Sequence, residues 1–66
     1  MAEGDIDIFI EFSENGNYVR VMQGKKLLYY AMESSPMHAM RKADMYKSMH
    51  ERQGFRVTTH KEKVYA

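Results

Sequence analysis

The chain has 66 residues, a formal net charge of +1 and no cysteine. A chain of this length forms a single domain, residues 1–66, and buries only about 60% of the surface that its unfolded form exposes. The absence of cysteine excludes disulfides and thiolate metal sites, and no apolar run approaches the ~20 residues of a membrane-spanning helix. Because the N-terminus is acidic and polar rather than signal-like, we expect a cytoplasmic protein without membrane contacts.

The first predicted element is a strand over residues 5–13, DIDIFIEFS. Isoleucine or phenylalanine recurs at every second position from 6 to 12, with acidic residues or Phe9 between them, which is the period of a half-buried strand. Asn15-Gly16 follows, a favoured pair for a two-residue type I′ turn because both central residues adopt positive φ. The sequence therefore predicts a hairpin with a second strand over residues 17–23. In this register Glu11 pairs with Arg20 on one face of the sheet.

A second hairpin is predicted at Gly24-Lys25, leading into a strand over residues 26–32. With this two-residue loop, Met22 faces Leu27 and Arg20 faces Tyr29. A three-residue loop is the alternative, and it places Leu28 and Tyr30 on that side instead. An apolar face survives with either loop, because the run LLYYAM is apolar on both sides of the strand.

A helix is predicted over residues 36–53, with Ser35 as its N-cap. Gly54 stands at the C′ position, where a Schellman motif would place Phe55 against His50 or Met49. A fourth strand is predicted over residues 55–60, followed by a polar tail over residues 61–66. The resulting fold class is α+β: a small antiparallel sheet in strand-strand-strand-helix-strand order, with one helix packed on one face.

This arrangement predicts a second apolar face that the helix does not cover. The residues predicted to bind a partner through it are Phe9, Glu11, Tyr18, Arg20, Met22, Leu27 and Tyr29. Tyrosine, phenylalanine, methionine and arginine are enriched in protein interfaces. We therefore expect a non-enzymatic protein-binding module, either a homodimer or a modulator or inhibitor of a partner protein. Its size and architecture are similar in outline to phage-encoded modulators of host enzymes, without a shared motif.

Nucleic-acid binding is the alternative interpretation. Phe9, Tyr18 and Tyr29 would stack on unpaired bases, and Lys25 and Lys26 would form a basic rim. Residues 6–53 also resemble, in order of elements only, the sheet-type DNA-binding domains at the N-termini of some recombinases. The acidic residues of the first strand would repel phosphate on the same face. In a third interpretation, the tail or the fourth strand covers this face.

The sequence offers little catalytic or metal-binding chemistry. His38 and His50 are twelve residues apart on one helix, about 18 Å at 1.5 Å per residue, so they do not share an ion. His60 falls on the fourth predicted strand and could lie near His50, but the sequence spacing fixes no carboxylate or thiolate beside it. No nucleophile, phosphate-binding or dinucleotide motif occurs. We expect neither an enzyme nor a bound metal or cofactor.

Overall fold

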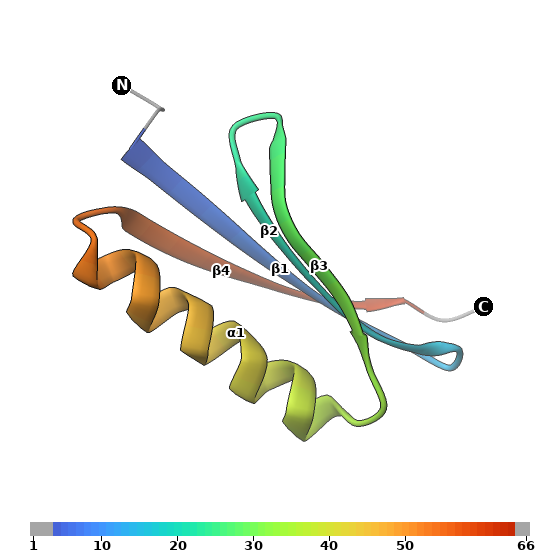
Figure 1. Ribbon diagram of the computed structural model, residues 1–66. Coiled ribbons are helices and arrows are strands. Elements are labelled where there is room, and N and C mark those ends of the chain that lie inside the picture. Colours follow the sequence, from blue (N-terminus) through green and yellow to red (C-terminus); the bar gives the residue numbers. More distant parts are fainter. Residues whose placement is uncertain (1–3, 65–66) are drawn as a thin grey trace.

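The computed structural model describes residues 4–64 and shows two layers, a four-stranded sheet and one helix packed against it (Figure 1). The elements in chain order are β1 (Asp5–Ser13), β2 (Gly16–Gln23), β3 (Lys26–Glu33), α1 (Pro36–Arg52) and β4 (Arg56–Val64). The predicted α+β class and the predicted order of elements are confirmed.

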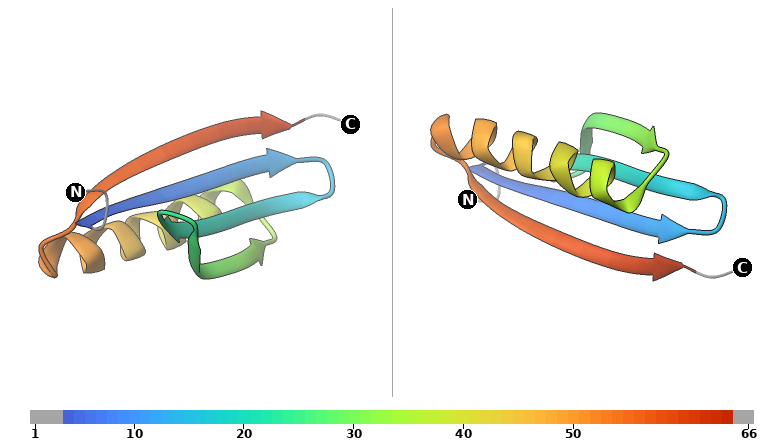
Figure 2. Two further views of the ribbon diagram at one scale, coloured as in Figure 1. Left: turned by 90° about the horizontal axis from the view of Figure 1, so that it is seen from above. Right: turned by 90° about the horizontal axis from the view of Figure 1, so that it is seen from below.

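The sheet has the strand order β3-β2-β1-β4 and is mixed, not antiparallel throughout as the sequence predicted. The first three strands are antiparallel, but β4 runs parallel to β1 because α1 returns the chain to the beginning of that strand (Figure 2). β4 pairs along the whole of β1, from Asp5 beside Arg56 to Ser13 beside Val64. The part of the predicted tail that the structure describes, residues 61–64, is therefore edge strand.

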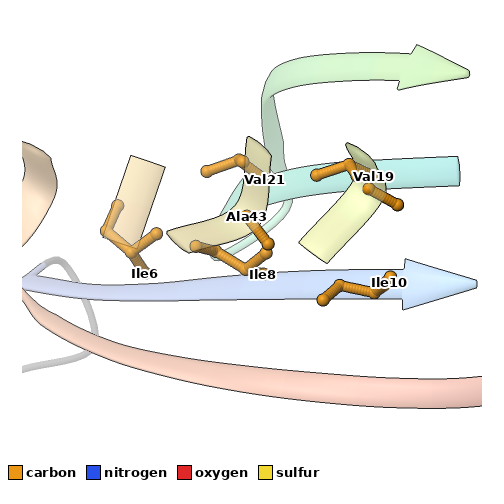
Figure 3. Close-up of a cluster of buried hydrophobic side chains, with 7 residues drawn as sticks. Ile6, Ile8, Ile10, Val19, Val21 and Ala43 are labelled. Carbon is orange, nitrogen blue, oxygen red and sulfur yellow. The ribbon is translucent and has the colours of Figure 1, made fainter. Parts of the chain in front are cut away.

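The core lies between α1 and the face of the sheet that it covers, here called the inner face. Its buried side chains come from β1, β2 and α1: Ile6, Ile8, Ile10, Val19, Val21, Ala39 and Ala43. Figure 3 shows the isoleucines of β1 and the valines of β2 gathered around Ala43. The two alanines carry no bulk beyond Cβ, so the helix approaches the sheet closely.

Both ends of α1 are capped as the sequence predicts. The Ser35 hydroxyl oxygen accepts a hydrogen bond from the His38 backbone N–H at 3.2 Å. At the other end Gly54 has a φ of 96°, and its N–H and that of Phe55 donate to the last turn of the helix. The Phe55 ring meets His50 edge-on at 6.0 Å between ring centroids. These contacts form the Schellman motif, which turns the chain into β4.

The predicted register of the first hairpin is wrong by two residues. Ser13 pairs with Gly16, so the loop residues are Glu14 and Asn15. Positive φ occurs at Gly16 (144°) but at no described residue other than glycine, so Asn15 does not adopt the type I′ conformation. The Ser13 hydroxyl instead donates to the Gly16 carbonyl oxygen at 2.8 Å. Because the shift is even, each side chain keeps its predicted face.

The second hairpin begins as predicted and then departs from the prediction at a β-bulge. Met22 faces Leu27, but Val21 faces Tyr29, which leaves Leu28 as an extra residue in β3. A bulge bends its strand, and the β2–β3 hairpin curls away from α1 (Figure 1). Beyond the bulge the faces of β3 are exchanged. Tyr29 therefore points to the inner face, where its ring lies 4.3 Å from that of Tyr46.

The Tyr29–Tyr46 contact predicts a loss of stability in alkali. Desolvation, with a further contribution from Tyr29, raises the pKa of Tyr46 above its ordinary value of 10.0. The unfolded chain then releases this proton at a lower pH than the folded chain, so the stabilising contribution is complete below about pH 10 and is lost as the pH rises through the folded-state pKa. In urea titrations, we expect the free energy of unfolding to fall less between about pH 9 and pH 11 for Tyr46→Phe than for the wild type. Equal falls would contradict this assignment.

Candidate functional site

The face of the sheet opposite α1, here called the outer face, carries a row of side chains that crosses all four strands. Tyr30 pairs with Arg20, Arg20 with Phe9, and Phe9 with His60. This row follows from the register, because residues directly opposite each other point to the same face. It joins the edge strand β3 to the edge strand β4 through the centre of the sheet.

Phe9 lies in the middle of this row and is held by its neighbours. The Arg20 guanidinium carbon lies 4.7 Å from the centroid of the Phe9 ring, and the His60 ring stacks on Phe9 at 4.6 Å. His60 Nε2 lies 2.9 Å from Asp7 Oδ1, and both side chains are about two-fifths exposed. Phe9 is therefore half-buried within its own sheet. Its main contribution is to hold Arg20 and His60 in position.

Five apolar or aromatic side chains form a continuous surface on the β2–β3 side of the outer face. This outer apolar patch consists of Tyr18, Met22, Leu27, Tyr30 and Met32. Leu27 is 52% exposed, Tyr30 55% and Met32 62%. The rings of Tyr18 and Tyr30 stack at 6.0 Å between centroids. A Cβ added at Gly16 would lie 3.2 Å from the Met32 sulfur, so this methionine lies over the start of β2.

Charge divides the outer face into two halves. Asp7, Glu11 and Glu62 lie on the β1–β4 half, whereas the patch on the β2–β3 half has no acidic member. Lys25 and Lys26 are exposed at the β2–β3 turn, next to Leu27. The described part of β4 lies in the plane of the sheet beside β1. This part of the chain therefore lies beside β1 and not across the outer face. The end of the predicted tail, residues 65–66, lies outside the described residues.

The structure places all but one of the seven predicted binding residues on the outer face, the exception being Tyr29. The predicted Glu11–Arg20 pair does not form either, because the register places Glu11 opposite Tyr18 and Arg20 opposite Phe9. The two differences have separate causes. The bulge at Leu28 turns Tyr29 to the inner face, and the position of the first turn changes the partners of Glu11 and Arg20.

Sequence reasoning missed three residues of this face. Met32 and Tyr30 reach this face because the bulge exchanges the two faces of β3. The alternative three-residue loop also placed Tyr30 there, but for a different reason. The bulge leaves no signal in a run that is apolar at every position. His60 was missed because its place depends on the parallel pairing of β4 with β1, which periodicity does not reveal.

The histidines do not converge on one point. His60 lies on the outer face, whereas His50 lies between Tyr46 and Phe55 on the side of the helix. The sheet therefore separates these two rings. Among residues 4–64, no group of three or more histidine, cysteine or carboxylate side chains is arranged to hold a metal ion.

One hollow lies away from the outer face, at the end of the first hairpin. It has a volume of about 380 Å³ and is lined by Phe12, Ser13, Glu14, Asn17, Pro36 and Lys63. The start of α1 leaves Phe12 partly uncovered at this point. Asn17 is buried, and its side-chain amide donates to the Glu33 carbonyl oxygen at 3.3 Å. This amide therefore joins the start of β2 to the end of β3.

Within the described residues, no helix combines the length and the apolar character needed to cross a membrane. Comparisons with protein-family models, with curated proteins and with solved structures each find no match for the chain. Inference about function therefore depends on the outer face and its surroundings.

Proposed function

We propose that the chain is a small, non-enzymatic binding protein that associates with another protein surface through the outer apolar patch. The observation that carries this proposal is the exposure of Leu27, Tyr30 and Met32, each more than half accessible on adjoining positions of one sheet. Exposed apolar groups that gather in one place mark interaction sites in small soluble domains. Among the residues whose burial is described, the core consists of seven side chains, so leaving such a patch in water is costly for this fold.

Arg20 supplies the directional contact in this proposal. It is exposed between Tyr30 and Phe9, and its guanidinium rests on the Phe9 ring. A guanidinium held in this way retains free donors while losing little side-chain freedom on binding. Arginine and tyrosine at the centre of an apolar patch are typical of binding hot spots. The mechanism is occupancy, in which the chain covers a site on its partner.

Nucleic-acid binding is the second candidate, and the stacked Tyr18–Tyr30 pair beside Arg20 favours it. Exposed aromatic rings with a nearby cation stack on unpaired bases. The charge distribution supports it less, because Asp7, Glu11 and Glu62 share the outer face. Of the predicted basic rim, Lys25 stands at the β2–β3 turn next to this face, whereas the pairing of Lys26 with Gln23 places Lys26 on the inner face.

Site-specific photo-crosslinking in the producing cell tests the proposal. A benzophenone side chain replaces Tyr30 at the centre of the patch, and in a control chain it replaces Ser48, which is exposed on α1. Because benzophenone reacts only with groups in contact, we expect protein adducts from position 30 and none from position 48. Gel mobility, protease digestion and mass spectrometry identify the adducts.

Each outcome of the crosslinking separates the two candidates. A defined protein adduct at position 30, whether with the chain itself or with another protein, supports the proposal. An adduct that nuclease removes favours the nucleic-acid candidate instead. Equal adducts at both positions, or none at position 30, would count against a working surface on the outer face.

A further inference from the structure

We propose that a second copy of the chain pairs antiparallel along the free edge of β3, the strand that carries Leu27, Tyr30 and Met32, and joins two four-stranded sheets into one of eight strands. The inference rests on the proposed function, and it names a second copy of the chain as the protein that contacts the β3 side of the outer apolar patch. It draws on three observations: the contrast between the two sheet edges, the charges at the ends of β3, and the register that the bulge imposes.

The two edges of the sheet differ in chemistry. Along β4 the edge carries charged side chains, including Arg56, Lys61 and Lys63, and such charges protect a strand from pairing with other chains. Along β3 there is no charged residue from Leu27 to Met32. β3 is therefore an eight-residue edge with unpaired backbone groups and exposed apolar side chains, which favours addition of a further strand.

The ends of β3 carry opposite charges. Lys25 and Lys26 stand at its beginning and Glu33 at its end, with the uncharged run between them. Antiparallel pairing of two copies places the lysines of each beside the glutamate of the other. Parallel pairing would place like charges together. Among these two arrangements, charge complementarity therefore selects the antiparallel one, which is a closed two-fold contact.

The bulge fixes a register that agrees with the faces of the strand. If Tyr30 pairs with its own copy at the two-fold axis and Leu28 is counted as the bulged residue, Leu27 lies opposite Met32 and Lys26 opposite Glu33. In each of these pairs the two side chains belong to the same face of the sheet, as the pairing of β3 with β2 shows. Leu27, Tyr30 and Met32 of each copy then gain cross-strand contacts with the other copy, which bury the β3 side of the outer apolar patch.

Assembly through β3 stops at two copies. After β3 has paired, the edges that the four described strands leave to the combined sheet are the two β4 strands, which carry Lys61 and Lys63. These charges oppose further strand addition. The bend at the Leu28 bulge also opposes the addition of further strands, because a bent edge is a poor template for indefinite stacking. The expected species is therefore a dimer and not a fibre.

A charge-swap experiment tests the register directly. Sedimentation equilibrium of the full chain, with a monomer mass of 7.8 kDa, measures the dimer dissociation constant. We expect Lys26→Glu and Glu33→Lys each to weaken the dimer about tenfold or more, because each variant opposes like charges at two symmetric contacts. An equimolar mixture of the two variants restores both contacts, so it should form a one-to-one heterodimer close to wild-type affinity.

Lys63→Glu is the matched control, since it makes the same charge change on the opposite edge and should leave the dimer unchanged. Far-ultraviolet circular dichroism verifies that each variant is folded. A wild-type chain that is monomeric at about 100 μM, or a mixture no tighter than its components, overturns the inference. In either case a crosslink from position 30 to a different protein would leave the proposed function standing, whereas loss of that crosslink would remove both.

Discussion

Replacing Ile8 with alanine is expected to lower the free energy of unfolding by about 3 kcal/mol. Ile8 is fully buried at the centre of the inner face, between β1 and the helix (Figure 3). The substitution removes three carbon atoms from the buried cluster of isoleucines, valines and alanines, and the cavity that remains adds to the loss of apolar burial. A chain of this length has a total stability of about 3–10 kcal/mol, so the variant should be close to unfolding at room temperature.

Urea titration at a fixed protein concentration measures this effect, since any association would make stability depend on concentration. Met45→Ala is the matched control, because it also removes three heavy atoms but from a helix position that is 53% exposed. It should change stability by less than about 0.5 kcal/mol. Similar losses in the two variants would mean that the inner face is not the core.

Replacing Ala43 with leucine is expected to destabilise the fold by about 2 kcal/mol through overpacking. Ala43 is 2% exposed and lies among the isoleucines of β1 and the valines of β2 (Figure 3). A leucine there must push α1 away from the sheet or adopt a strained rotamer. The close approach of the helix would then be lost along its length.

Thermal or urea unfolding of Ala43→Leu checks this expectation, with Ser48→Leu as its control. Ser48 is on the same helix but exposed, so the added side chain meets no neighbour across the core. We expect the control to lie within about 0.5 kcal/mol of the wild type. If Ala43→Leu were as stable as the wild type, the helix would not pack on the sheet at this position.

The fold could be predicted from the sequence wherever local chemistry decides the structure. Alternation in β1 specified the strand and its inner face, and Ser35 and Gly54 set the two ends of α1 through capping. These features depend on residues within a few positions of one another. The parallel pairing of β4 with β1 depends on contacts between residues about fifty positions apart, and no short pattern encodes it.

The outer face was less accessible to sequence reasoning because two local exceptions decide its details. The first turn uses Glu14 and Asn15 rather than Asn15 and Gly16, which altered the cross-strand partners but not the faces. The bulge at Leu28 places Tyr30 on the outer face instead of Tyr29. The sequence does not signal this exchange, because a run that is apolar throughout gives no preference for either face. An error of one residue in β3 therefore changes the composition of the binding surface.

The central place of β1 has a consequence for how the chain is made. β1 is synthesised before the other strands, yet one of its two neighbours is β4, which follows the helix in the chain. Until β4 has left the ribosome, one side of β1 lacks its backbone partner, and the newly made chain holds the three-stranded meander and α1. β4 is the last of the four strands to be made, so the sheet is completed only after α1 has been synthesised. Its slowest step should be the capture of β4 by β1, which lies about fifty positions earlier in the chain.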